Sequence, residues 1–277
     1  MSVLTRRSFI ELLARERARE LLDAGTFREL LGPFDRLKSP WLPLQGIVPQ
    51  SDDGVVIARG RIDGAAAVVA AIEGAYQGGS MGEVSGSKIA AALELALRDC
   101  ERGRPVIPVV LFETGGVRLQ EANLGLAVIS EIHSALVALR RHVPVIGVIA
   151  GMVGCFGGMS LAAALCTQLI VTRQARLGMN GPEVIEQEAG IAEMDATDRV
   201  AIWKLIGGEQ RHATGLADAL VEDDVEAVAA EVRKACRAGV CANPRSTDTQ
   251  RFLSRLARID PAHVPDPQSL RRLWSTM

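Results

Sequence analysis

Aromatic side chains are scarce in this chain of 277 residues: Phe, Trp and Tyr together make up 4%, with a single Tyr. Proteins that stack nucleic-acid bases, or that lie in the interface of a membrane, depend on such rings. The net charge is only −2 and no long polybasic run occurs, which also argues against nucleic acid. We therefore expect no nucleic-acid partner.

Long uncharged apolar runs are missing as well. A membrane-spanning helix needs about 20 apolar residues, and the best candidate, residues 143–165, is interrupted by Pro144 and several glycines. The start, MSVLTRRSFIELLARER, carries charges inside its apolar pattern, so it is not expected to be a signal peptide. The five cysteines form no CxxC pair and indicate reduced thiols. We expect a cytoplasmic protein with no membrane association.

Several motifs that are typical of particular enzyme classes are also absent. The sequence contains no GxxxxGK[ST], no GxGxxG at the spacing of a dinucleotide-binding fold, and no GxSxG. Its four histidines are scattered and form no cluster with cysteine or carboxylate at the spacing of metal ligands. These absences argue against a P-loop nucleotidase, a dinucleotide enzyme and an acyl-serine mechanism, and we expect no bound metal.

Apolar strand-like runs alternate with segments of helical periodicity along most of the chain. We expect strands at residues 55–58, 65–72, 106–112, 143–149, 168–172 and 175–179. We expect helices at residues 7–31 (stopping near Gly25), 87–101 (capped by Ser87), 120–141, 159–165, 182–187, 195–207, 223–239 and 247–258. Asp63-Gly64 signals a hairpin turn between the first two strands. The alternation predicts an α/β fold with a parallel or mixed sheet. We interpret residues 1–277 as a single domain, with an N-terminal helical segment over 1–32 and a peripheral tail over 260–277.

Glycine clusters are the most distinctive feature that is present. They lie at residues 78–86, 115–116 and 151–158, each where a strand gives way to a helix. Tight turns explain most glycine clusters, but two of these three follow buried strands. Backbone N–H groups from two such loops can converge on one oxygen and form an oxyanion hole without a titratable side chain. Such a site suits decarboxylation, carboxyl transfer, isomerisation or hydration through a thioester enolate.

Four stretches carry a resemblance to a known family. GGSMGEVSG (78–86), GGVRLQEA (115–122), NGPEVIEQ (180–187) and ARERARELLDAGTFREL (14–30) resemble the acyl-CoA carboxyltransferase branch of the crotonase superfamily. The resemblance covers roughly residues 10–225. It implies a crotonase-like (ClpP/crotonase) ββα spiral with surrounding helices.

Within that branch, the chain resembles the β subunits of biotin-independent malonate decarboxylases. No cysteine precedes Cys100, so the zinc ribbon of acetyl-CoA carboxylase β subunits is not expected, and the length is half that of propionyl-CoA carboxylase-type subunits. The resemblance implies that this chain and a γ subunit decarboxylate malonyl-S-acyl carrier protein to acetyl-S-acyl carrier protein and CO2. The carrier protein would bear a CoA-like prosthetic group, phosphoribosyl-dephospho-CoA. No permanently bound cofactor, no biotin and no metal is implied for this chain.

The resemblance also implies a set of site residues. Backbone N–H groups near four glycines would stabilise the enolate: Gly115, Gly116, Gly157 and Gly158. Residues of the same loops would bind the thioester: Gly79, Ser80, Met81, Gly82, Val117, Cys155 and Phe156. The proton donor is left open among water at the partner interface and four side chains: Ser80, Glu113, Glu121 and Cys155. Two departures from the family pattern stand out, since Val117 replaces Ala and ETGG (113–116) replaces ASGG.

Polar residues beside these loops have two interpretations each. Arg118, Gln120 and Glu121 would fix a loop or contact the partner, or would only pair locally at a helix start. Asn180, Glu183, Glu186 and Gln187 would shape the subunit interface, or would form a solvated helix face.

Two other functions stay open. The chain could be the carboxyltransferase subunit of a biotin-dependent acyl-CoA carboxylase, which CO2 release without biotin would exclude. It could also be a non-catalytic scaffold that docks the γ chain, in which case changes to the glycines would leave activity unaltered.

Overall fold

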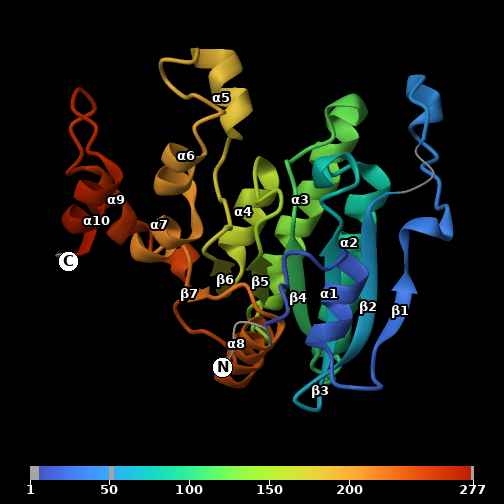
Figure 1. Ribbon diagram of the computed structural model, residues 1–277. Coiled ribbons are helices and arrows are strands. Elements are labelled where there is room, and N and C mark those ends of the chain that lie inside the picture. The colour runs from blue at the N-terminus through green and yellow to red at the C-terminus, as the bar shows by residue number, and fades with distance from the viewer. Residues whose placement is uncertain (1–5, 50–52, 276–277) are drawn as a thin grey trace.

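Across residues 6–49 and 53–275, which the computed structural model describes, a seven-stranded mixed sheet forms the centre of the protein (Figure 1). The strands lie side by side in chain order: β1 (Arg28–Leu31), β2 (Val55–Ile62), β3 (Ala65–Ile72), β4 (Ile107–Phe112), β5 (Ile146–Ile149), β6 (Gln168–Thr172) and β7 (Ala219–Val221). The pairs β1–β2 and β2–β3 are antiparallel, and β3 to β7 are parallel. The carboxyl ends of β3, β4 and β5 therefore meet at one edge.

The hairpin between β2 and β3 confirms the turn that the sequence predicts. Asp63 and Gly64 both have positive φ angles, 49° and 77°. Two consecutive left-handed residues give the tight turn whose twist matches the flanking strands. The pairing runs without a break from Ile62 opposite Ala65 to Val55 opposite Ile72.

A second, short layer of bridges follows the main strands. Met81 pairs with Val117, and Cys155 pairs with both Thr114 and Leu177. Each of β3, β4 and β5 is thus followed by a bridging segment and then by a helix. These helices are α2 (Glu83–Glu101), α3 (Ala122–Leu139) and α4 (Gly158–Leu165). The repeated strand–bridge–helix unit is the ββα pattern that the sequence resemblance predicts.

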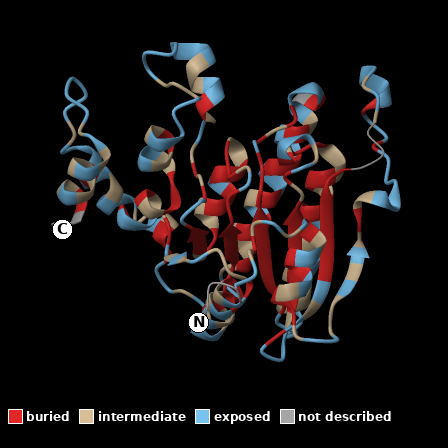
Figure 2. Ribbon diagram, in the orientation of Figure 1, coloured by how far each residue is buried: buried red, intermediate tan, exposed pale blue. Residues whose placement is uncertain are grey.

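Helices cover both faces of the sheet. The crossovers through α2, α3 and α4 all step in the same direction, and right-handed crossovers then place these helices on one face. On the other face α1 (Ala14–Leu21) packs on β2 and β3, while α8 (Val225–Ala238) packs on β5 to β7 and contacts α1. The central strands are consequently buried on both sides, as the red core of Figure 2 shows, and every residue of β4 is buried.

The C-terminal third adds smaller helices around the edge of the sheet near β7. They are α5 (Pro182–Ala189), α6 (Arg199–Ile206), α7 (Gly208–Ala213), α9 (Thr249–Leu256) and α10 (Pro267–Ser275). Of these, α5 projects away from the sheet (Figure 1). Within the expected tail, α10 packs against α7 and buries Trp274. No helix in the described part of the chain has the length and apolar character needed to cross a bilayer.

Several boundaries differ from the sequence-based expectation. The helix expected over 7–31 is confined to α1, and Arg28–Leu31 forms edge strand β1 because it pairs with β2. The capping prediction for Ser87 is wrong: α2 begins at Glu83, and the Ser85 hydroxyl accepts the N–H of Gly82. Residues 175–179 form only isolated bridges instead of a strand. The first five residues of the expected N-terminal segment lie outside the described residues.

Candidate active site

Three loops meet at the carboxyl edge of the parallel strands, as the topology of such a sheet requires. Backbone hydrogen bonds join the loop after β3 to the loop after β4: Gly115 N donates to Gly78 O, and Met81 N to Gly116 O, both at 2.8 Å. The loop after β5 joins the same assembly, since Thr114 N donates to Gly154 O at 2.8 Å. The glycine clusters 78–86, 115–116 and 151–158 thus form one continuous structure.

Gly116 and Gly157 lie in direct backbone contact at the centre of this assembly. A Cβ atom on Gly116 would lie 3.3 Å from the Cα atom of Gly157, and one on Gly157 would lie 3.1 Å from the Cα atom of Gly116. Both residues also have positive φ angles, 110° and 60°. Glycine is required at both positions, for the conformation and for the close approach.

The N–H groups of the predicted glycines are not equally available. Gly115 N donates to Gly78 O, Gly116 N to the Thr114 hydroxyl at 3.1 Å, and Gly157 N to Met179 O at 2.8 Å. Three of the four glycines proposed to hold the enolate oxygen therefore already use their N–H groups within the chain. This placement argues against those three as the donors.

Two neighbouring N–H groups are available instead. Within residues 6–49 and 53–275, no acceptor takes the N–H of Val117 or of Gly158. Gly158 is the first residue of α4, where backbone N–H groups have no partner inside the helix. Val117 N lies 3.8 Å from the Cβ position of Gly157, so both groups lie at the contact between the two loops. From the sequence, Val117 is expected only to bind the thioester. Its role as a donor is not predictable locally, because hydrogen-bond partners distant in the sequence decide which backbone N–H groups remain free.

Three of the expected substrate-binding side chains face the core. Met81, Cys155 and Phe156 are buried, which leaves only their backbone for contact with a substrate. Burial raises the pKa of the Cys155 thiol well above its usual value, so this group is a neutral thiol. Cys155 is therefore a packing residue and a poor candidate for the proton donor.

Gly79 and Gly82 serve packing between the loops. A Cβ atom on Gly79 would overlap the carbonyl oxygen of Glu113, and one on Gly82 would lie 2.4 Å from the Glu121 carboxylate. Ser80 is half-buried, and its hydroxyl accepts a hydrogen bond from Arg118 Nε at 3.3 Å. These residues shape the loop after β3.

Arg118 and Glu121 form a buried ion pair that fixes the loop before α2. Arg118 Nη1 donates to Glu121 Oε1 at 2.8 Å, and Arg118 Nη2 donates to Ser80 O at 3.0 Å. Glu121 Oε2 accepts the N–H of Glu83, the first residue of α2, at 2.6 Å. The interpretation of these two residues as loop-fixing groups is therefore the one that the geometry supports, and Glu121 is not free to donate a proton.

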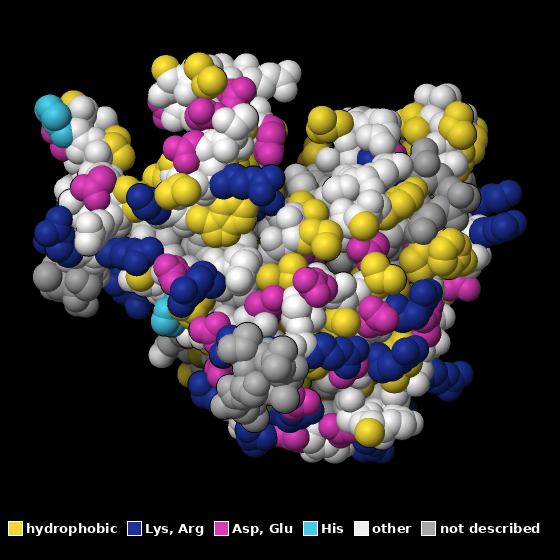
Figure 3. Space-filling view, in the orientation of Figure 1, with side chains coloured by type: hydrophobic (Ala, Val, Ile, Leu, Met, Phe, Trp, Pro, Cys, Tyr) yellow, Lys and Arg dark blue, Asp and Glu magenta, His cyan; other side chains and the backbone are white. Residues whose placement is uncertain are grey.

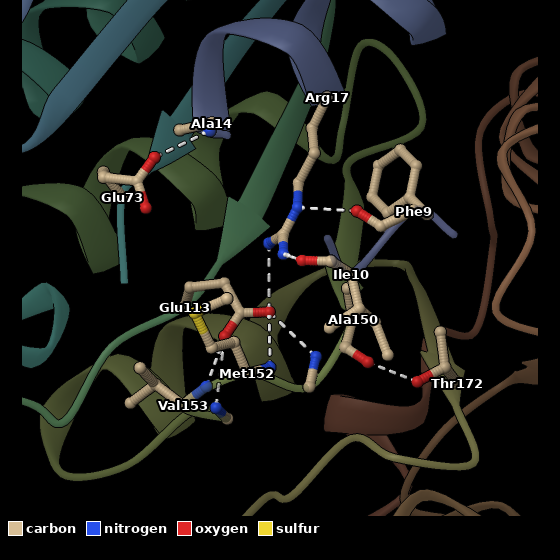
Figure 4. Close-up of polar contacts among 12 residues, drawn as sticks. Phe9, Ile10, Ala14, Arg17, Glu73, Glu113, Ala150, Met152, Val153 and Thr172 are labelled. Atoms are coloured by element: carbon tan, nitrogen blue, oxygen red, sulfur yellow. Dashed lines mark hydrogen bonds and ion pairs between the residues drawn. The ribbon is translucent and has the colours of Figure 1, made fainter. Parts of the chain in front are cut away.

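Glu113 is another carboxylate that is fully engaged. Its two oxygens accept hydrogen bonds from Arg17 Nη1 at 3.1 Å and from the backbone N–H groups of residues 151–154 at 2.7–3.3 Å (Figure 4). The side chain is 1% exposed. With five donors directed at it, Glu113 holds a loop and does not fit the role of proton donor.

Of the four polar residues expected at an interface, Asn180, Glu183 and Gln187 are exposed and Glu186 is half-buried. Asn180, Glu183 and Glu186 precede or lie on α5, which projects from the body of the protein (Figure 1). Glu186 Oε2 accepts the N–H of Ala196 at 2.6 Å and so braces the following loop. Within the described residues, no group of three His, Cys, Asp or Glu side chains is placed to hold a metal ion.

A family comparison agrees with this architecture. Residues 10–246 match the model of the carboxyl transferase domain. The chain belongs to the carboxyl transferase domain family. The crotonase-like α/β fold expected from the sequence is thereby confirmed.

Individual relatives narrow the likeness further. The chain is 61% identical to a subunit in the crystal structure of a Pseudomonas malonate decarboxylase hetero-tetramer in complex with malonate, with a TM-score of 0.93 over 98% of this chain and 99% of that one. It is 42% identical, over 79% of its own length and 72% of the relative's, to a malonyl-S-ACP:biotin-protein carboxyltransferase of Malonomonas rubra. The resemblance to malonate decarboxylase subunits is thus confirmed.

More distant relatives are longer proteins. The methylmalonyl-CoA carboxyltransferase 12S subunit of Propionibacterium freudenreichii is 33% identical over 76% of this chain but only 37% of its own length. This chain therefore corresponds to one part of such a subunit.

Proposed function

We propose that this chain is the β-type subunit of a malonate decarboxylase, which converts a malonyl thioester on an acyl carrier protein to an acetyl thioester and CO2. The observation that carries the proposal is the pair of unpartnered N–H groups, Val117 and Gly158, at the contact between two glycine loops. The 61% identity to a malonate decarboxylase subunit over nearly the whole of both chains supports the choice of substrate.

The chemistry follows from where charge develops. When the bond to the carboxylate breaks, its electron pair moves toward the thioester carbonyl and CO2 leaves. The resulting enolate oxygen accepts the N–H groups of Val117 and Gly158, which are held in place before the reaction. One such donor contributes about 10²–10³ in rate. A proton then returns to the α carbon.

Three of the four side chains considered from the sequence do not fit as the source of that proton, and the hydroxyl of the fourth, Ser80, is held by Arg118 Nε at 3.3 Å. Glu113 and Glu121 have their oxygens occupied, and the Cys155 thiol is buried and neutral. We assign the proton to water or to a group of the partner subunit.

A partner subunit and a carrier protein complete the proposed enzyme. The similar Pseudomonas structures are a hetero-tetramer and a hetero-dimer of malonate decarboxylase subunits. We assign the partner to a γ subunit of the same superfamily. The carrier would bear phosphoribosyl-dephospho-CoA, whose extended arm would lie along the loop formed by residues 78–86.

The cysteines of the chain are all free, which supports a reducing, cytoplasmic location. One continuous core supports a single domain.

The Malonomonas relative favours a second function. Its name describes transfer of the malonyl carboxylate to a biotin protein, so this chain could pass CO2 to biotin instead of releasing it. Both reactions share the same enolate, and they differ in the fate of the carboxylate.

An assay with avidin separates the two. The complex, purified with its partner, is given carrier protein loaded with a carboxyl-labelled malonyl thioester, and CO2 release is followed with and without excess avidin. We expect release without added biotin protein and no inhibition by avidin. Inhibition by avidin, or dependence on a biotin protein, would instead establish the carboxyl transfer.

A matched pair of variants tests the oxyanion hole itself. Gly158→Pro removes the N–H group at the first helical position, where proline is tolerated, and Gly158→Ala keeps it. Both variants place a Cβ atom 2.9 Å from Ile129 Cγ2, so their ratio cancels that contact and leaves the replacement of the N–H by the proline ring. We expect the kcat of Gly158→Pro to lie about 10²–10³-fold below that of Gly158→Ala. Equal activity of the two assembled variants would refute the hole and favour the scaffold interpretation.

A further inference from the structure

A single carboxylate gathers four consecutive backbone N–H groups beside the proposed oxyanion hole. Glu113 Oε1 accepts Gly151 N at 2.8 Å and Met152 N at 3.3 Å, and Oε2 accepts Val153 N at 2.7 Å and Gly154 N at 3.3 Å. Figure 4 shows these groups directed at the carboxylate from one side. Successive N–H groups curved around an anion form a nest, and here the anion is a side chain of the protein itself.

The positive φ angles of two glycines allow this curvature. Gly151 has a φ of 127° and Gly154 a φ of 98°, conformations that other residues rarely adopt. A Cβ atom on Gly151 would also lie 2.6 Å from the backbone of Gln174. The loop is therefore built to present its N–H groups inward, toward the position that Glu113 occupies.

A buried counter-charge completes the cluster. Arg17 Nη1 donates to Glu113 Oε1 at 3.1 Å, and both side chains are almost fully buried. The other nitrogens of Arg17 donate to the carbonyl oxygens of Phe9 and Ile10. Residues 9 and 10 are themselves tied to the turn before α8, because their N–H groups donate to the Asp223 carboxylate at 2.8 and 3.0 Å. The N-terminal segment thus reaches the loop through Arg17.

Glu113 connects the two halves of the proposed hole. Its backbone continues into Thr114 and, four residues on, into Val117, which carries one free N–H. Its side chain holds residues 151–154, which continue into Gly158, the carrier of the other free N–H. No other carboxylate in the described residues accepts hydrogen bonds from the 151–154 loop.

We infer that Glu113 is a positioning residue that sets the separation of the Val117 and Gly158 N–H groups by holding the 151–154 loop. This role rests on the proposed function, because it acts on the hole defined there. Displacement of a reacting or stabilising group by about 1 Å is enough to cost about 10²-fold in rate. A loop that loses half of its anchoring bonds therefore loses catalysis while its substrate-binding surface remains.

The direct test is Glu113→Gln in the assembled complex. Gln has the same size, but its NH2 group cannot accept, so one half of the nest faces a donor. We expect kcat to fall about 10- to 100-fold, with the KM for the malonyl carrier protein within about twofold of the parent's.

The control variant is Glu73→Gln. The Glu73 carboxylate accepts the N–H of Ala14, at the start of the helix that carries Arg17, and the N–H of Ala75. It makes no hydrogen bond to the 151–154 loop, and this variant should keep kcat within about twofold.

A double-variant comparison distinguishes positioning from general support of the fold. If Glu113 acts through the hole, Glu113→Gln should lower kcat by less than about threefold in the Gly158→Pro background, where one hole donor is already gone. If Glu113 only stabilises the fold, the two losses multiply. Multiplying losses, or an assembled Glu113→Gln enzyme with unchanged kcat, would overturn the inference.

Arg17→Lys covers the case in which Glu113→Gln fails to assemble. Lys keeps the charge but cannot serve Phe9, Ile10 and Glu113 together from one planar group. We expect a smaller loss in kcat, about 3- to 10-fold, at unchanged KM; an unchanged kcat here would overturn the inference. If Gly158→Pro loses activity while Glu113→Gln keeps full activity, only the positioning role of Glu113 is refuted. If Gly158→Pro keeps full activity, the proposed hole is refuted as well.

Discussion

The Arg118 guanidinium and the Glu121 carboxylate, 2.8 Å apart and both nearly inaccessible to solvent, join the loops that follow β3 and β4. Arg118 reaches back to Ser80 O, and Glu121 reaches the first N–H of α2. The pair therefore holds the segment to which we assign the extended arm of the carrier.

Replacing Glu121 by Gln should weaken the hold of the ion pair on that segment and lower the stability of the protein. Removing one partner of a buried pair leaves the other charge uncompensated, at a cost of about 3–5 kcal/mol in the free energy of unfolding. We expect a rise in the KM for the carrier thioester as well, because the binding loop moves. Denaturant unfolding and steady-state kinetics measure the two effects. Gln120→Ala is the control, since Gln120 is exposed and bonds only to Gln77 at 3.1 Å. An unchanged KM in Glu121→Gln would argue against the arm-binding role of this loop.

The backbone contact between Gly116 and Gly157 gives a second prediction. Gly157→Ala places a methyl group 3.1 Å from Gly116 Cα and should separate the two loops, with a loss of about 10²-fold in kcat. Gly239→Ala imposes a similar backbone strain, at a φ of 70° and a ψ of −159° compared with 60° and −147° at Gly157, with no atom within 4 Å of the new Cβ. It should reduce stability by about 1–3 kcal/mol and leave kcat unchanged. Equal kcat in both variants would show that the close approach is not needed.

Local chemistry explains which parts of the fold the sequence could predict. The hairpin at Asp63-Gly64 depends on turn residues adjacent in the chain, and β4 on a continuous apolar run. Edge strand β1 depends on pairing Arg28 with Arg59, 31 residues along the chain, so the local spacing of its leucines predicts a helix instead. The three-residue strand β7 was missed for the same reason, since only its pairing with β6 defines it.

The candidate site could likewise be predicted from the sequence only where local chemistry determines it. The glycine clusters mark the loops, because strand ends in a parallel sheet share an edge. Which N–H groups remain free could not be predicted, since Gly115 and Gly157 are occupied by carbonyls of Gly78 and Met179. Glu113 follows an apolar run with nothing nearby to reveal its acceptor role, because its donors lie some forty residues downstream and, in Arg17, near the N-terminus.

The buried thiols predict how stability depends on pH. Cys155 and Cys166 are fully buried; burial raises the pKa of Cys166 to about 12 and that of Cys155 well above its usual value. The neutral thiol is thus favoured in the folded state. In the unfolded chain a thiol ionises near pH 8.5. The stabilisation is fully present below that pH and is lost as pH rises toward the folded value, by up to about 1.4 kcal/mol per pH unit for each thiol.

Cys166→Ala should flatten this decline. Urea unfolding at pH 8, 9 and 10 gives the free energy of unfolding of the parent and the variant, and the variant should lose less between pH 9 and 10. The substitution also lowers the free energy of unfolding by removing packing, but this cost is the same at every pH and does not affect the change with pH. Parallel curves would show that the Cys166 thiol does not contribute to the pH dependence.

We expect the partner subunit to dock at the outer end of the α5–α6 region. Val184, Ile191 and Val200 are 47%, 65% and 65% exposed, and Figure 3 shows hydrophobic side chains at the projecting end of this region. Contact with a partner would remove them from water, so an aspartate there would be desolvated without a counter-charge. We expect Ile191→Asp to raise the Kd for the partner at least about 10-fold, measured by titration of one purified subunit into the other. Val264→Asp changes a valine between α9 and α10 that is 75% exposed, and this variant should bind normally. Normal assembly of Ile191→Asp would place the partner on another face.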